Sequence, residues 1–140
     1  MVGNRYFSPL DQSGVRVVTV VAMMLAGAGG ALLRFVIDGA VKHRRTVSFP
    51  WATIVINVSG SLLLGFLAGL VMFDGAPNSL QQIVGTGFCG GYTTFSTASF
   101  ETVRLAQQRH SLKALGNAVG SLVASVSACV AGLALAGALS

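Results

Sequence analysis

The sequence predicts an all-α membrane protein with four transmembrane helices in one domain spanning residues 1–140, and three observations support this prediction. Hydrophobic residues make up 53% of the chain and charged residues only 9%, whereas soluble domains carry about a quarter charged residues. Four stretches have no charged residue: 17–33, 49–73, 83–100 and 114–139. Each is close to or above the roughly 17 to 25 residues that a helix needs to cross a bilayer. The connections between them are short.

The first helix is expected over residues 15–37. Its apolar run, preceded by Arg5 and Arg16, could also be a cleaved secretory signal. The run is longer than the about 7 to 15 apolar residues of a signal core, and its small residues also suit close helix packing. A retained first helix is therefore the prediction.

The second helix, expected over 49–73, and the fourth, expected over 111–139, each carry polar residues at intervals of four. These are Thr53, Asn57 and Ser61 in the second helix and Asn117, Ser121 and Ser125 in the fourth. This spacing places each set on one helix face, and polar side chains inside a membrane are functional candidates by default. The spacing alone leaves two interpretations open, which are hydrogen bonds between helices and a lining of donors along a pathway.

The third helix, expected over 80–107, contains the run GTGFCGGYTTFST at residues 85–97. Backbone groups in a bilayer must be satisfied internally, so a break is tolerated only where protein, an ion or water covers it. The glycines and hydroxyls therefore predict a helix that is broken in mid-membrane, beside a buried ion site or pathway. A re-entrant loop is the alternative.

The net charge of +5 does not indicate a nucleic acid partner, because in a membrane protein the distribution of Lys and Arg matters more than their sum. Arg5 and Arg16 are the two basic residues of the N-terminal region. Seven others belong to the first and third connections: Arg34, Lys42, Arg44, Arg45, Arg104, Arg109 and Lys113. The positive-inside rule then predicts that both termini face outward.

No catalytic constellation is present in the sequence. There is no acid pair, no Ser/His/Asp arrangement and no phosphate-binding glycine loop. Cys89 and Cys129 fall inside predicted spans and are expected to be small, buried hydrophobic residues. His43 and His110 fall in polar loops and are expected to be solvated. The sequence therefore argues against an enzyme.

Three strings resemble the Fluc/CrcB fluoride channel family, and the resemblance covers essentially the whole chain. They are GGALLR at 29–34, Pro50 followed by Thr53, Asn57 and Gly60-Ser61, and GFCGGYTTFST at 87–97. The last string is the most specific.

The resemblance implies four-helix subunits in an antiparallel dimer, multi-pass in the cell membrane and in contact with lipid, which export fluoride ion passively and so lower cytoplasmic fluoride. It implies a structural sodium ion (Na+), not transported, at the dimer centre on the carbonyls of Gly90 and Thr93, and an aqueous vestibule at Arg34. The pore residues it implies are Asn57, Phe95, Thr94, Ser96, Ser121 and Ser125.

Two features depart from the family pattern. The family usually carries a second phenylalanine three residues after the first, but here position 98 is Ala98. The next aromatic residue, Phe100, is two residues further along and so lies about 200° from position 98 around a helix. The bias in Lys and Arg is also large for an antiparallel homodimer of one sequence. Together these features suggest a heterodimer with an oppositely oriented paralogue, as the alternative to a homodimer.

Two further functions remain to be weighed. One is an accessory or pore-degenerate subunit, which Ala98 favours. The other is a small multidrug-type transporter, which needs a membrane-embedded carboxylate. No Asp or Glu falls within a predicted membrane span, apart from Glu101 at the end of the third. The transporter is therefore the more distant alternative.

Overall fold

The computed structural model describes residues 9–44 and 49–140. Within these ranges the chain is all-helical, without a strand. Its elements are α1 (Pro9–Arg44), α2 (Trp51–Phe73), α3 (Asn78–Leu80), the π-helical segment η1 (Gln81–Cys89), α4 (Gly90–Tyr92), α5 (Phe95–Gln107) and α6 (Ser111–Leu139). The basic residues Arg5 and Arg45 lie outside the described residues, as do the side chains of Lys42, His43 and Arg44.

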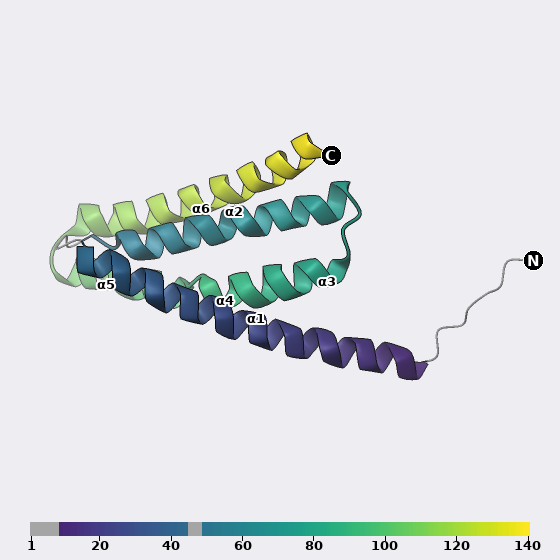
Figure 1. Ribbon diagram of the computed structural model, residues 1–140. Coiled ribbons are helices and arrows are strands. Elements are labelled where there is room, and N and C mark those ends of the chain that lie inside the picture. The colour runs from purple at the N-terminus through teal and green to yellow at the C-terminus, as the bar shows by residue number, and fades with distance from the viewer. Residues whose placement is uncertain (1–8, 45–48) are drawn as a thin grey trace, which may run out of the picture.

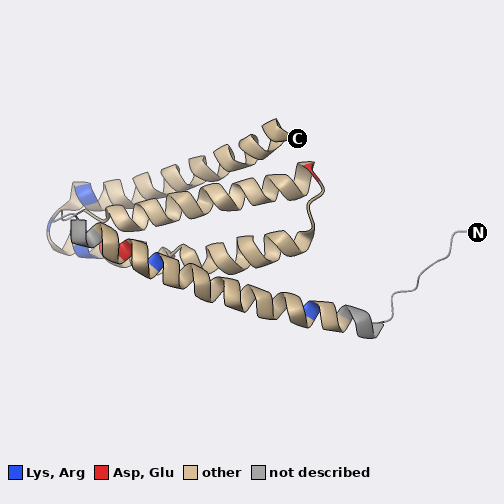
Figure 2. Cartoon of the chain, viewed as in Figure 1, with Lys and Arg blue, Asp and Glu red and all other residues tan. Residues whose placement is uncertain are grey.

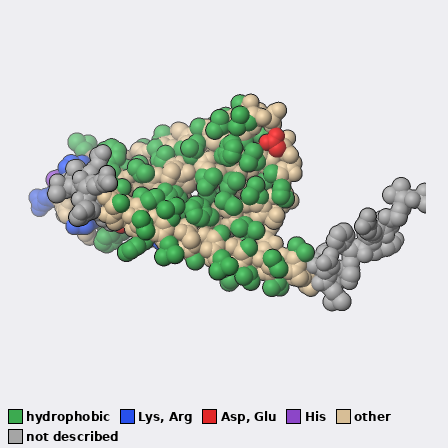
Figure 3. All heavy atoms as spheres, viewed as in Figure 1, with side chains coloured by type: hydrophobic (Ala, Val, Ile, Leu, Met, Phe, Trp, Pro, Cys, Tyr) green, Lys and Arg blue, Asp and Glu red, His purple; other side chains and the backbone are tan. Residues whose placement is uncertain are grey.

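Three helices are long and apolar enough to cross a membrane: Ser13–Val41, Trp51–Phe73 and Ser111–Leu139. A further helical column, called the third column because it corresponds to the predicted third helix, is formed by α3, η1, α4 and α5 in succession (Figure 1). Large apolar side chains cover much of the visible surface (Figure 3), and many are well exposed, among them Val18, Leu25 and Leu122. A surface of this kind suits contact with lipid, and the prediction of a multi-pass membrane protein is confirmed.

The bundle is arranged around α2. This helix packs most extensively on α6 and also contacts η1, while α1 packs on η1 and α4, and α5 packs on α6. The N-terminal half of α1 extends along one side of the bundle (Figure 1). The third column therefore lies between α1 on one side and α2 with α6 on the other.

Glycines allow two of these contacts to be very close. A Cβ atom added to Gly65 of α2 would collide with the backbone carbonyl of Cys129, and one added to Gly132 of α6 would collide with that of Leu62. Between α1 and the third column, a Cβ on Gly30 would collide with the Phe88 carbonyl. These backbones approach each other where a side chain would not fit, as in small-residue interfaces of membrane helices.

The helix bounds differ from the expected ones mainly in α1, which extends beyond 15–37 in both directions. No proline follows Pro9 until Pro50, so nothing in the sequence stops the helix at residue 37. Between α2 and α3 the chain turns at Gly75, whose φ of +65° is a conformation that glycine adopts without strain.

Candidate pore and ion site

The third column is interrupted at Thr93 and Thr94. Helix α4 ends at Tyr92, and the next two residues are extended, with φ/ψ of −78°/160° at Thr93 and −150°/123° at Thr94. The Thr94 side chain then begins α5 as its N-cap, because Oγ1 accepts a hydrogen bond of 3.2 Å from the Thr97 N–H. Two successive threonines thus leave the helix, and the column starts again at Phe95.

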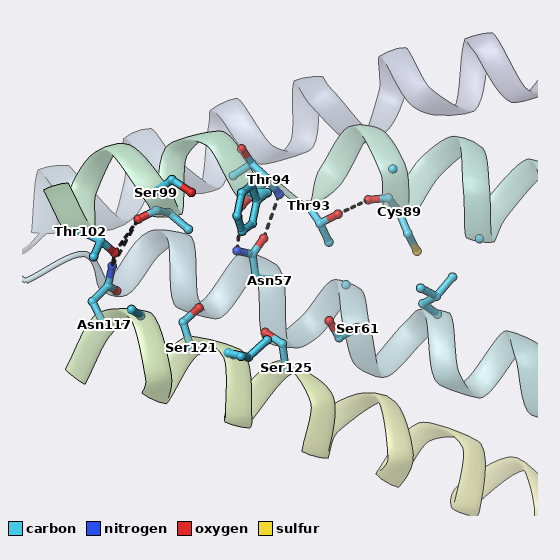
Figure 4. A pocket seen from close by; sticks show the side chains of 18 of the residues that line it. Asn57, Ser61, Cys89, Thr93, Thr94, Ser99, Thr102, Asn117, Ser121 and Ser125 are labelled. Carbon is cyan, nitrogen blue, oxygen red and sulfur yellow. Dashed lines mark hydrogen bonds between the residues drawn. The ribbon is translucent and has the colours of Figure 1, made fainter. Parts of the chain in front are cut away.

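Asn57 of α2 faces this interruption and binds the backbone of Thr94 twice. Its Nδ2 donates to the Thr94 carbonyl at 2.9 Å, and its Oδ1 accepts from the Thr94 N–H at 2.8 Å (Figure 4). In an uninterrupted α-helix the Thr94 N–H would donate to the Gly90 carbonyl. That carbonyl therefore lacks its helical donor.

A second contact joins α2 to the residue before the interruption. The hydroxyls of Ser59 and Tyr92 lie 2.9 Å apart, and Tyr92 is only 7% exposed. Between the two attachment points, Gly60 makes room for the third column, because a Cβ atom there would collide with Cγ2 of Thr93.

A cavity of about 780 Å³ opens beside the interruption and is enclosed by residues of α2, η1, α4, α5 and α6. Ten polar or hydroxyl-bearing residues contribute to its wall: Asn57, Ser61, Thr86, Thr93, Thr94, Ser99, Thr102, Asn117, Ser121 and Ser125. Figure 4 labels all of them except Thr86. The remainder of the lining is apolar or glycine, and none of the described residues that form it is charged.

Five of the six predicted pore residues line this one cavity: Asn57, Thr94, Phe95, Ser121 and Ser125. Ser96 does not. Successive helix residues are about 100° apart, so with Phe95, Ala98, Ser99 and Thr102 facing the cavity, Ser96 is directed elsewhere; its Oγ lies 3.2 Å from the Thr94 hydroxyl.

The residues predicted to bind sodium lie at the cavity, whereas the residue predicted to form the vestibule does not. Gly90 and Thr93 both line the cavity. Arg34 is half-buried on α1 and is not part of the lining. No group of three or more His, Cys, Asp or Glu side chains occurs within the described residues, so oxygen ligands for a cation at the interruption would have to be backbone carbonyls and hydroxyls.

The polar residues of α6 fall into two kinds, although they share one face. Asn117 is 1% exposed and donates to the Thr102 hydroxyl at 2.8 Å, and Thr102 donates in turn to the Ala98 carbonyl at 2.8 Å. Ser121 is 8% exposed, yet neither it nor Ser125 makes a hydrogen bond with any described residue. Asn117 therefore joins α6 to α5, whereas the two serines present free hydroxyls to the cavity.

The sequence analysis did not single out Ser99 or Thr102 as site residues. The signal that could have found them is helical spacing, because Ala98, Ser99 and Thr102 follow Phe95 at intervals of three and four residues. In α2 the same rule overpredicts, since Thr53 is 2% exposed and lies outside the cavity while Asn57 and Ser61 line it.

Phe95 is unusual among the lining residues because its side chain is 87% exposed. It stands at the first position of α5, directly after the interruption, and lines the cavity. Its aromatic ring is available to another molecule or to a second copy of the chain.

Comparison with known proteins gives one family. Residues 21–133 match the family model described as "CrcB-like protein, Camphor Resistance (CrcB)". A protein of Leifsonia xyli subsp. xyli named fluoride-specific ion channel FluC 1 is 48% identical over 120 residues, which cover 86% of this chain and 88% of that protein. Fluoride-specific ion channel FluC 2 of Mycobacterium bovis is 43% identical over 80% of this chain and 86% of its own length. Fluoride-specific ion channel FluC 1 of Thermobifida fusca is 42% identical over 86% and 97%.

Proposed function

The chain belongs to the CrcB family, whose relatives named above are ion channels and not enzymes, and we propose that it is a fluoride-specific channel. In this proposal it lets fluoride leave the cell passively across the cell membrane and thereby lowers cytoplasmic fluoride. The observation that carries the proposal is the uncharged cavity whose wall holds the free hydroxyls of Ser121 and Ser125.

Fluoride chemistry fits this wall. The ion is small and strongly hydrated, so a pore must replace its water with hydrogen-bond donors, and hydroxyl and amide groups are such donors. Because the described lining has no fixed positive side chain, the anion would be held by several weak donors in succession. Conduction requires binding that is strong enough to admit the ion and weak enough to release it.

Phe95 would supply an additional contact for the anion. Aromatic rings have a positive edge, and a ring presented edge-on attracts an anion without a full opposite charge. Its 87% exposure supports a role at the boundary between the cavity of one subunit and the surface of the next. The subunits would pair in antiparallel orientation, with the interruption of the third span in mid-membrane.

A structural sodium ion at the centre of such a dimer is part of the proposal. The Gly90 carbonyl lacks its helical donor because the Thr94 N–H is bound to Asn57, and the extended Thr93 takes its own carbonyl out of the helical series. Carbonyls of unwound membrane helices suit Na+ coordination, so these residues fit the ion. Bound there, it would supply a fixed positive charge, and it would not be transported.

The alternative, a heterodimer with an oppositely oriented paralogue, is supported by Ala98. This residue lines the cavity beside Phe95 and Ser99 and contributes only a methyl group where the family usually has a ring. In a heterodimer one pore could remain intact while the pore of this chain is degenerate, which would make the chain an accessory subunit. A small multidrug-type transporter is less well supported, because no described carboxylate lines the cavity.

The test is fluoride efflux from liposomes that contain the purified chain alone, recorded with a fluoride-selective electrode, with chloride efflux from the same preparation as the control. Rapid fluoride efflux without chloride efflux is expected. Folded protein that releases no fluoride would contradict a self-sufficient channel. Coexpression with a second CrcB-family chain from the same genome then distinguishes a heterodimer, in which efflux appears, from a chain that takes no part in fluoride transport.

A further inference from the structure

The side-chain amide of Asn57 is already engaged by the protein. Both of its hydrogen bonds go to one residue, through the N–H and the carbonyl of Thr94 at 2.8 and 2.9 Å. This is the pattern by which one extended residue pairs with another across two strands. A side chain of α2 thus takes the place of a backbone partner.

We propose that Asn57 is a positioning residue, which holds Thr93 and Thr94 out of the helix and thereby fixes where Phe95 begins α5. The consequence for transport rests on the proposed function, since it is Phe95 at the cavity that is positioned. The pairing itself does not depend on fluoride.

The energetics favour this role. Outside the helix, the Thr94 N–H loses the Gly90 carbonyl as its acceptor, and leaving this half-buried backbone donor without a partner is unfavourable. Asn57 Oδ1 supplies the acceptor, so the extended conformation of Thr94 is stable only while that oxygen is in place.

The neighbouring residues are arranged to bring the amide to Thr94. Gly60, three residues along α2, leaves space for the side chain of Thr93, and the Ser59–Tyr92 contact of 2.9 Å attaches the end of α4 to the same helix. Asn57 is half-buried and lines the cavity. Since Nδ2 carries two hydrogens, one N–H remains for a ligand in the cavity.

Substitutions at position 57 separate this role from simple anion binding. Asn57→Leu keeps the number and branching of the side chain's heavy atoms and removes both hydrogen bonds. Asn57→Asp removes the donor to the Thr94 carbonyl but keeps an oxygen that can accept from the Thr94 N–H. Ser61→Ala is the matched control, because Ser61 lies one turn further along α2 and lines the same cavity without binding Thr94.

The experiment is residue-resolved hydrogen exchange of the purified full chain in detergent or nanodiscs, without fluoride. In Asn57→Leu the Thr94 amide is expected to exchange about tenfold faster than in the unmodified protein, as for the loss of one buried hydrogen bond. It should stay close to the original rate in Asn57→Asp and in Ser61→Ala. Asn57→Ala gives the same comparison if the leucine variant does not fold.

An unchanged Thr94 exchange rate in the folded leucine or alanine variant would overturn the proposal, as would equally fast exchange in the aspartate variant. Fluoride efflux of the same preparations is recorded separately. If the unmodified chain conducts no fluoride, alone or coexpressed with a second CrcB-family chain, but the exchange pattern is as expected, the proposed function fails and the positioning role stands. If the unmodified chain conducts fluoride but the Thr94 exchange rate does not change in the variants, the channel function stands and the positioning role is refuted.

Discussion

At the scale of single residues, what a polar side chain can do is decided by whether the protein has already used its hydrogen bonds. Asn117, Ser121 and Ser125 recur on one face of α6, but Asn117 is bound to Thr102, whereas Ser121 and Ser125 are free to bind a ligand in the cavity. Only the latter two are expected to contribute directly to transport.

Ser121→Ala should therefore lower the rate of fluoride efflux from liposomes by about tenfold, because hydrogen bonds to charged groups contribute about 1.5–3 kcal/mol. Ser127→Ala is the control, since Ser127 lies on the same helix, is exposed and is outside the cavity. Equal rates for the two variants would show that the Ser121 hydroxyl does not contact the ion.

Asn117→Ala should act differently from the serine substitution. It leaves the Thr102 hydroxyl without its donor and opens a space in the α5–α6 contact, so we expect the free energy of unfolding to fall by about 1–3 kcal/mol. Thermal unfolding followed by circular dichroism in detergent measures this. A loss of efflux with unchanged stability would instead make Asn117 a ligand of the ion.

At the scale of elements, the bundle depends on glycines whose surroundings differ from one position to the next. Gly132 packs against the backbone of α2 near Leu62, while a Cβ on Gly120 of the same helix would have no neighbour within 4 Å. In α1, Gly30 packs against Phe88, while the adjacent Gly29 faces open space. Glycine is therefore required for close helix packing at some positions, whereas at others a larger side chain would fit.

Gly132→Ala is expected to lower the free energy of unfolding by about 1–3 kcal/mol, the cost of overpacking. Gly120→Ala should leave it unchanged or raise it, because alanine has the higher helix propensity. Gly30→Ala and Gly29→Ala form a second pair, for which the same order is expected. Thermal unfolding of the four variants side by side is the measurement, and similar midpoints within each pair would contradict these helix contacts.

At the scale of the whole molecule, charge is strongly polarised. Among the described residues, Arg104, Arg109 and Lys113 gather where α5 turns into α6, and Arg16 lies near the far end of α1 (Figure 2). Positive residues favour the cytoplasmic side, so this end of the bundle should face the cytoplasm. A chain with such a bias is expected to insert mainly in one orientation.

Fusions to the C-terminus can measure that orientation. An alkaline phosphatase fusion, which is active only outside the cytoplasm, should be active, and a green fluorescent protein fusion, which is fluorescent only inside, should be dark. Comparable signals from both fusions would mean that the chain inserts both ways, as a homodimer of antiparallel subunits requires. A single orientation would favour pairing with a second, oppositely biased chain.

Composition and charge pattern are sufficient to predict the class of protein, and the family resemblance predicts part of the cavity wall. Charge-free stretches of bilayer length predict spanning helices for two reasons. Charged side chains are costly in hydrocarbon, and the backbone polar groups there must be hydrogen-bonded within the protein, as they are in a helix. The family resemblance, most specific at residues 87–97, implies the pore residues Asn57, Thr94, Phe95, Ser121 and Ser125, and all five lie around one cavity.

Which of these polar groups still have hydrogen bonds to offer is visible only once the helices are packed together. Spacing assigned Asn57, Asn117 and Ser121 the same status, because a helical pattern describes the direction of a side chain and not its partner. Only the packing of α2 against the third column pairs the Asn57 amide with the backbone of Thr94, and only the α5–α6 contact occupies Asn117. Hydrogen bonds between residues distant in sequence depend on how the helices pack, which local sequence does not encode.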